Sequence, residues 1–396
     1  MKYEMKSRER VIRTFNRQET DKLPVDFGGT VVTCIDYRAH IKLKNYFGIK
    51  DAESDKIIDY TMGTVEPCEQ IMQMFESDFR RISLNFTKPE IINGIFENGF
   101  GMKFKKAEPH EYFDLIYSPM QNADIFDIAD MTMPNPGDSS LYFGLKDRAK
   151  DLYENSDYAI VADFGVPGFY ETSQKLRGYE NLACDLLENT EFITALYDKL
   201  FELQKKFFGN YLEQVGKYVN VIGYADDLGM QDRPQISPEI YRNIIKPYHK
   251  KIFNFIHEIT DAKILLHSCG AIFPLIGDLI DAGVDILNPV QVTAKDMQPS
   301  KLKEAFGDKI IFWGGIDEQH IIPKGTPSEI YAEVERMINI MGRNGGYIIA
   351  PAHNIQDDTP PRNIAAMYGA ANKLRNYQCK NEREARELLS FIDKKY

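Results

Sequence analysis

The stretch KILLHSCGAIFPLIGDLIDAGVDILNPVQ, residues 263–291, holds the pattern that decides the fold. Two short apolar runs, at its beginning and its end, flank a longer segment with helical spacing. Near-continuous apolar runs are typical of parallel strands that are buried on both faces. The stretch therefore predicts a strand, a helix and a second strand. The first strand ends on His267 and Cys269, two side chains that can bind a metal.

The same alternation runs through most of the chain. Eight β-rich runs, each followed by a longer helical pattern, cover residues 23–29, 79–86, 158–166, 218–227, 263–270, 284–291, 310–317 and 346–353. Helix start signals support this interpretation, since Thr326 and Pro327 open one helix with Glu329 in capping-box spacing. Pro247 predicts a break in the helical pattern that begins at residue 238. Eight repeats predict an α/β fold, a (β/α)8 TIM barrel; an open doubly wound sheet is the alternative.

One long segment, between the second and third predicted strands, departs from the alternation. Within it, Asn98-Gly99 lies between β-compatible runs and predicts a hairpin turn. We expect residues 86–150 to form an inserted hairpin and loop over the mouth of the barrel. The whole chain, residues 1–396, is then expected to be one barrel domain.

Composition and charge narrow the class of protein. Hydrophobic residues make up 43% and charged residues 27% of the chain, as in ordinary globular domains. The net charge of -11 argues against nucleic acid or an acidic membrane as a partner. Five scattered cysteines do not suggest a disulfide framework, and neither a signal peptide nor a membrane-spanning run is apparent. We expect a cytoplasmic protein; the oligomeric state stays open, and a homodimer is compatible with the sequence.

Polar residues collect at the carboxyl ends of the predicted strands, where barrels of this kind carry their chemistry. They are Asp26, Asp163, Asp226, Asp227, His267, Cys269, Asn288, Asp317, Glu318 and His353. A carboxylate after a strand often caps the next helix, and this remains an alternative for Asp163 and Asp317. Asn288 is also a common turn former. Only one of Asp226 and Asp227 is expected to face the site, because neighbouring strand residues point to opposite faces.

The pair His267 and Cys269 predicts a metal site. Two positions apart at a strand end, both side chains can point to the same side. Imidazole and thiolate are zinc ligands, and a catalytic zinc takes three protein ligands and keeps one open position. His353 is the best-placed third ligand, with His320 in reserve. The alternative is a structural role, since a buried cysteine often behaves as a small hydrophobe.

Several segments resemble the uroporphyrinogen decarboxylase superfamily. They are YADDLGMQDRPQISPEIYRNIIKPYHKKI (224–252), residues 265–291, FWGGID (312–317), PAHNIQDDTPPRNI (351–364) and the opening residues 7–29. The likeness runs from about residue 7 to about residue 375. The superfamily fold is a (β/α)8 barrel, which agrees with the strand count. One branch holds metal-free decarboxylases that bind a polyanionic tetrapyrrole; the other holds zinc-dependent methyltransferases that work with a corrinoid.

The resemblance is closer to the methyltransferase branch, which includes the methylcobalamin:coenzyme M methyltransferases. Those enzymes carry H-x-C after a central strand, and His267-Ser268-Cys269 matches it. The decarboxylases carry an arginine-rich loop after the first strand, where this chain offers only Arg38. One departure is that coenzyme M methyltransferases take the third zinc ligand from a cysteine, whereas this chain has His353. The third ligand is therefore open, and a thiol substrate is less strongly indicated.

The resemblance also implies cofactors, a partner and catalytic residues. Zinc would act with a corrinoid, methylcobalamin or cob(I)alamin, carried by a separate corrinoid protein because the chain lacks a D-x-H-x-x-G signature. A methyl group would move between this corrinoid and a small methyl donor or acceptor, a methylated compound or a thiol. The resemblance matches Asp78 to the catalytic aspartate of the decarboxylases. From their positions at strand ends, we further hypothesise that Asp227 or Glu318 protonates the leaving group or orients the histidines. A metal-free decarboxylase of tetrapyrrole biosynthesis and a barrel that only binds a ligand are the alternatives.

Overall fold

A curled parallel sheet forms the centre of the molecule in the computed structural model, which describes residues 4–51, 55–108 and 112–376. Its strands are β4 (Phe79–Ser83), β8 (Ala159–Pro167), β9 (Val221–Ala225), β10 (Lys263–His267), β11 (Ile286–Asn288), β12 (Ile311–Trp313) and β13 (Tyr347–Ile348). Their order in the sheet is β13-β12-β11-β10-β9-β8-β4, and every neighbouring pair is parallel. The order follows the sequence without the reversal that an open doubly wound sheet requires.

The first predicted strand lies between the two ends of this sheet. Val25 forms a parallel bridge with Ile349, directly after β13, and the Asp26 amide donates to the Ile349 carbonyl. On the other side, the Asp78 amide donates to the Val25 carbonyl just before β4. Residues 24–26 thus connect the last strand to β4. The prediction of a TIM-barrel-like α/β fold is confirmed.

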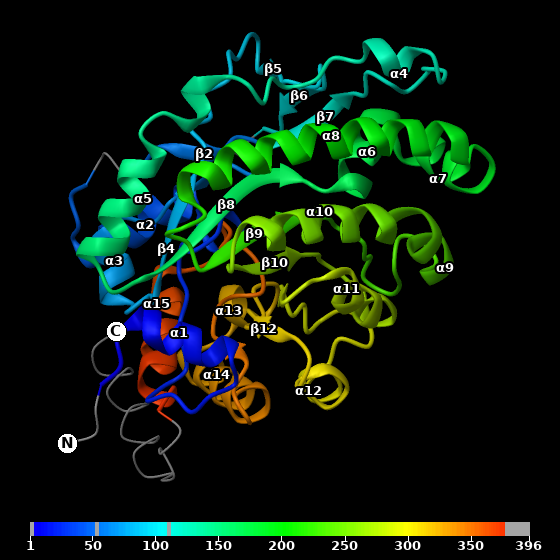
Figure 1. Cartoon of the computed structure of the whole chain (residues 1–396). Coiled ribbons are helices and arrows are strands. Elements are labelled where there is room, and N and C mark those ends of the chain that lie inside the picture. Colours follow the sequence, from blue (N-terminus) through cyan, green and yellow to red (C-terminus); the bar gives the residue numbers. More distant parts are fainter. Residues whose placement is uncertain (1–3, 52–54, 109–111, 377–396) are drawn as a thin grey trace.

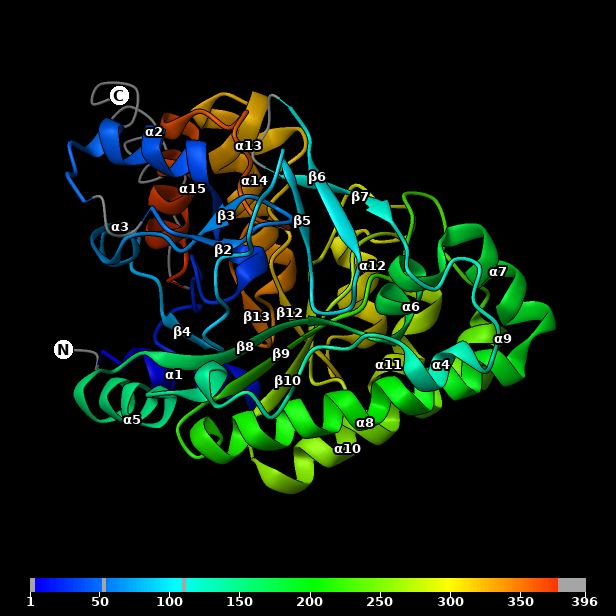
Figure 2. The same ribbon diagram turned by 90° about the horizontal axis from the view of Figure 1, so that it is seen from above.

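Helices surround the strands (Figures 1 and 2). They include α1 (Ser7–Phe15), α2 (Tyr37–Phe47), α5 (Leu145–Asn155), α6 (Phe169–Arg177), α7 (Tyr179–Glu188), α8 (Thr190–Val215), α10 (Lys246–Ile259), α11 (Ile276–Ala282), α12 (Pro299–Phe306), α14 (Pro327–Met341) and α15 (Pro361–Leu374). The capping box before α14 forms, because the Thr326 hydroxyl accepts from the Glu329 amide while the Glu329 carboxylate accepts from the Thr326 amide. A π-helical turn at Tyr241–Ile245 interrupts the helical segment before Pro247, as the proline predicts.

Two apolar cores hold the barrel together. The larger packs the helices against the outer face of the sheet. The smaller fills the barrel with alternate strand residues, among them Phe79, Val161, Val221, Leu265, Ile286, Ile311 and Trp313. Val11 and Phe15 of α1 belong to this inner cluster. The barrel is therefore a packed core, and only its carboxyl end is left to form a site.

The segment between β4 and β8 contains an antiparallel sheet of three strands, β5 (Ile95–Glu97), β6 (Lys103–Lys106) and β7 (Phe113–Tyr117). The predicted hairpin is confirmed, since Glu97 pairs with Lys103 across the turn that contains Asn98-Gly99. The sequence did not predict β7. The Phe113 amide donates to the Thr61 carbonyl, which ties β7 to the loop before β3 (Thr64–Val65). The division into one domain with a 86–150 insertion stays a prediction.

None of the helices in the described ranges combines the length and the apolar character that crossing a bilayer requires.

Candidate metal centre at the barrel mouth

Polar side chains form the uppermost inward-facing layer of the barrel. Side chains alternate along a strand, so a residue two positions after an interior residue also faces inward. Leu265 and Ile286 belong to the interior core, and His267 and Asn288 follow them by two positions on β10 and β11. The same spacing also explains why Asp227, an even number of positions after the interior Val221, lies at the mouth.

The two adjacent aspartates after β9 have different surroundings. Asp226 is fully buried, lies 2.9 Å from His249 Nε2 and accepts from the amides of Tyr170 and Glu171 at the start of α6. It therefore holds a helix end in place. Asp227 Oδ1 accepts from the Cys269 amide at 2.7 Å and lies 4.0 Å from His267 Nε2. Of the two carboxylates, that of Asp227 contacts the H-x-C segment, whereas Asp226 meets it through its backbone amide, which donates to the His267 carbonyl.

The structure brings His267, Cys269 and His353 together. One ligand atom from each lies within 4.8 Å of the others, and Cys269 Sγ is 3.3 Å from His267 Nε2. The two imidazole rings have their centroids 5.5 Å apart. Donor atoms around a tetrahedral zinc lie about 3.5 Å apart, given usual zinc–nitrogen and zinc–sulfur distances. Type and spacing of these three side chains fit a zinc ion.

Asn288 fixes how His267 presents its ring. His267 Nδ1 lies 2.6 Å from Asn288 Oδ1, and Asn288 Nδ2 donates to the Trp313 carbonyl at 3.1 Å. Because the amide nitrogen is used by that carbonyl, the amide oxygen faces the ring and His267 Nδ1 must donate to it. The lone pair of the neutral imidazole is then on Nε2, which faces Cys269. This is the tautomer that a metal site requires.

Carboxylates surround the thiol of Cys269. Burial and the charges of Asp227, Glu318 and Glu171 raise the pKa of Cys269 well above its usual value. Burial raises the pKa of Glu318 to about 7. Burial and the neighbouring His267 lower the pKa of His353 to about 4, so this imidazole is neutral at physiological pH. A bound divalent cation would offset the carboxylates and ionise the thiol.

A pocket of about 610 Å³ opens beside Cys269 and His353. Its walls come from the loop before β3, from β7 and from the segments after β11 and β12. They include Met62, Phe113, Asp114, Gln291, Glu318 and Gln319. Gln291 also accepts from the Gly270 amide and so holds the turn that follows Cys269. The candidate metal centre therefore adjoins a space that a small substrate can enter.

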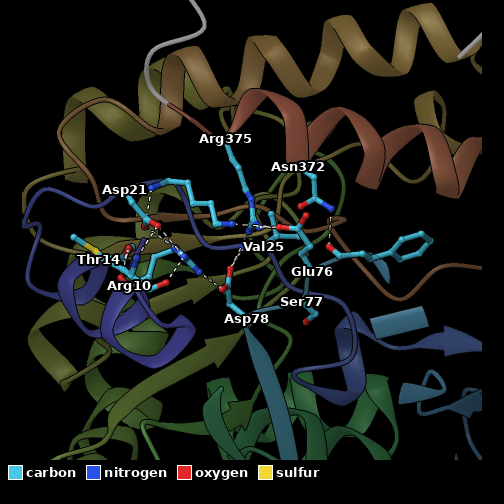
Figure 3. A network of polar contacts seen from close by, with 12 residues as sticks. Arg10, Thr14, Asp21, Val25, Glu76, Ser77, Asp78, Asn372 and Arg375 are labelled. Atoms are coloured by element: carbon cyan, nitrogen blue, oxygen red, sulfur yellow. Dashed lines mark hydrogen bonds and ion pairs between the residues drawn. The ribbon is translucent and has the colours of Figure 1, made fainter. Parts of the chain in front are cut away.

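Asp78, placed among the catalytic residues by resemblance, lies at the opposite end of the barrel, and that prediction is corrected. It directly precedes β4, whose carboxyl end forms the mouth, so it belongs to the amino end. Its carboxylate is 1% exposed and contacts Arg10 and Arg375, while the Val25 amide donates to it at 2.9 Å (Figure 3). These contacts give Asp78 a structural role.

Other predicted positions near the mouth have partners of their own. Asp26 accepts from Trp313 Nε1 and the Gly29 amide, and burial raises the pKa of Asp26 to about 7. Asp163 accepts from the Val31 amide and faces Arg81 at 3.6 Å. Asp317 accepts from the Gln319 and His320 amides, as the helix-cap alternative predicts. The exposed ring of His320 lies 3.2 Å from Asp317 and outside the metal group.

Sequence reasoning missed Glu171 and the orienting role of Asn288. Glu171 lies in the first turn of α6 and pairs with Lys175 at 2.6 Å. No local pattern marks it, because only the Asp226 cap brings that helix start to the mouth. The inward orientation of Asn288 could have been predicted, because it follows the interior residue Ile286 by two positions.

Comparison with known proteins identifies the family. Residues 170–374, more than half of the chain, match the family model described as uroporphyrinogen decarboxylase (URO-D). A solved methyltransferase from Methanosarcina mazei is similar in structure, with a TM-score of 0.64 at 18% identity, over 93% of this chain and 99% of that chain. A β-glycosidase from Thermosphaera aggregans has a TM-score of 0.41 at 9% identity, over 90% of this chain and 99% of that chain.

At 18% identity the similarity to the methyltransferase concerns the fold alone. No curated protein matches the chain. The family model covers β10, which ends at His267, and the loop after β13 that holds His353. By its sequence match and its barrel, the chain belongs to the uroporphyrinogen decarboxylase (URO-D) family.

Proposed function

We propose that this chain is a zinc-dependent methyltransferase that moves a methyl group between a small substrate and a corrinoid carried by a partner protein. The observation that carries the proposal is the group of His267, Cys269 and His353, assembled at the mouth of the barrel beside a pocket. The H-x-C pattern that resembles the methyltransferase branch supplies two of these three side chains.

Zinc in such a site supplies Lewis-acid polarisation of a substrate heteroatom, or lowers the pKa of a substrate thiol. One thiolate and two neutral imidazoles around a divalent cation leave a net charge of about +1. A more thiolate-rich site would donate more charge and favour a nucleophilic thiolate. The single cysteine therefore favours a methylated substrate whose heteroatom becomes a leaving group.

The residues around the group have separate tasks. Asn288 keeps His267 Nε2 available, and Asp227 holds the backbone of Cys269 through its amide. Glu318 lines the pocket, and since burial raises its pKa to about 7, it can hold a proton near neutral pH. That proton is available at Glu318 Oε2 for a leaving heteroatom.

The decarboxylase alternative has less support. A polyanionic tetrapyrrole needs several arginines, because bidentate pairing takes one guanidinium for each carboxylate. Arg38, the only arginine in residues 26–40, already pairs with Asp357 at 3.2 Å. Among the described residues that line the pocket, none is lysine or arginine.

Metal content tests the proposal. Anaerobically purified protein should hold about one zinc per chain, and Cys269→Ala should lose it. Methyl transfer from methylated compounds to free cob(I)alamin should stop after chelation and return when zinc is added. A folded protein that takes up no zinc would contradict the proposal and favour metal-free chemistry.

A further inference from the structure

The pocket beside the metal group is acidic. Asp114 and Glu318 line it, and the lining residues within the described ranges include no lysine or arginine. Asp227 lies against the metal group, since its Oδ1 accepts from the Cys269 amide at 2.7 Å and lies 4.0 Å from His267 Nε2. Negative charge therefore gathers where a substrate would meet the metal.

The lysine of α6 that lies beside Glu171 is already paired. Lys175 Nζ lies 2.6 Å from Glu171 Oε1, so these two charges compensate each other. A loaded group with two histidines and one thiolate adds only about +1. Two further carboxylates, Asp227 and Glu318, oppose that charge, whereas Asp114 lies opposite Lys105 in the β6–β7 pair. The site stays negative with its metal in place.

One carboxylate oxygen also lacks a donor. Glu318 Oε2 is buried and has no hydrogen-bond partner in the described part of the chain. A buried acceptor without a donor is costly, and a ligand that brings an N–H group or a positive charge removes that cost. The burial of Glu318, the negative charge of the pocket and the missing donor all favour a ligand that carries an N–H group or a positive charge.

We propose that the substrate of this pocket is cationic or uncharged, that the cationic form binds more tightly, and that anionic substrates such as sulfonated thiols are rejected. The inference rests on the proposed metal-dependent function. It concerns the substrate class and not the presence of the metal, so the two can fail separately.

The test uses cobalt(II)-substituted protein and three thiols of similar size: 2-aminoethanethiol, 2-mercaptoethanol and 2-mercaptoethanesulfonate. Thiol binding to the metal is measured from the thiolate-to-cobalt absorption at pH 8 and low ionic strength. We expect the cation to bind at least about tenfold more tightly than the anion, because like charges repel over a few ångströms. Raising the salt concentration should narrow the ratio.

Variants distinguish the effect of the pocket carboxylates from the affinity that each thiol has for the metal itself. Glu318→Gln and Asp114→Asn each remove one carboxylate from the pocket and should narrow the cation-to-anion ratio several-fold. Asp308→Asn is the matched control, because this exposed aspartate precedes β12 at the opposite end of the barrel. It should leave the ratio unchanged.

The outcomes are distinct. If the ratio of cation affinity to anion affinity falls in either pocket variant and not in the control, the preference for a cationic substrate is supported. If cobalt binds through Cys269 but the anion binds as tightly as the cation, the substrate class is wrong while the metal function stands. The same holds if neither pocket variant changes the ratio. If no Cys269-dependent cobalt binding occurs, the proposed function fails and the inference fails with it.

Discussion

The two ends of the barrel treat buried carboxylates in opposite ways. At the amino end, Asp78 contacts two arginines and a backbone amide, so both of its oxygens have donors (Figure 3). At the carboxyl end, Glu318 Oε2 is buried without a donor in the described residues, and its pKa is raised by burial. The first arrangement stabilises the fold; the second costs stability and leaves an acceptor for a ligand.

The amino-end cluster also joins distant parts of the chain. Arg10 belongs to α1, Asp78 precedes β4, and Arg375 follows α15. Their contacts connect the first helix, an early strand and the last helix of the barrel. We therefore expect that removal of a carboxylate destabilises the protein at the amino end of the barrel and stabilises the metal-free protein at the carboxyl end.

The largest expected effect is at the amino end. Asp78→Ala should lower the free energy of unfolding by about 3–5 kcal/mol, because it leaves two buried arginines without their shared anion. Chemical denaturation measures the change. Zinc binding by the folded variant should match the wild type. A loss of zinc affinity without a loss of stability would contradict the division between the two ends.

At the mouth, Asn288→Leu should lower zinc affinity about 10–100-fold, the usual effect of losing the partner that orients a ligating histidine. Competition with a chelator measures the affinity. Asn288→Asp keeps an acceptor for His267 Nδ1 and should recover part of the loss. If the leucine variant binds zinc as tightly as the wild type, Asn288 has no orienting role.

Glu318→Gln should change stability in the opposite direction to Asp78→Ala. The pKa of Glu318 is raised to about 7 in the folded protein, so its ionisation destabilises that state as pH rises from about 4.5 to 7. Below about pH 4.5, Glu318 is protonated in both the folded and the unfolded state, so its ionisation should cause little difference in the free energy of unfolding between the metal-free variant and the wild type. At pH 8 the variant should be more stable by up to about 3 kcal/mol. Urea unfolding at pH 5 and pH 8 measures this, and a pH-independent difference would refute it.

The smallest effect is expected for Arg38→Ala. Arg38 and Asp357 form a partly exposed ion pair, so its removal should cost at most about 1 kcal/mol of stability. Zinc content and methyl transfer should be unchanged. A large loss of activity with intact zinc would point to a substrate carboxylate at Arg38, and so to the decarboxylase alternative.

The barrel could be predicted because its strands are buried on both faces and leave continuous apolar runs. The first predicted strand is less regular in the structure than the others, because residue 25 forms a single bridge there. Its backbone hydrogen bonds nevertheless connect the two edges of the sheet. The strand β7 was not predicted, because its sequence carries no turn signal comparable to Asn98-Gly99. Alternation also explains why Asp227 and not Asp226 reaches the mouth.

Site residues whose positions depend on strand ends could be predicted from the sequence. Those whose positions depend on a helix start could not. His267 and Cys269 lie at one strand end and His353 follows another, so barrel geometry alone brings them close. Glu171 reaches the mouth through a helix start that Asp226 caps, a contact no local pattern reveals. Asp78 was misplaced because a motif resemblance does not say at which end of a strand a residue lies.

The most direct test of the central claim is X-ray absorption at the zinc edge of the zinc-loaded protein. We expect one sulfur ligand at about 2.3 Å and two imidazole nitrogens at about 2.0–2.1 Å. A zinc environment without sulfur, or with two or more protein sulfur ligands, would contradict the assignment of His267, Cys269 and His353.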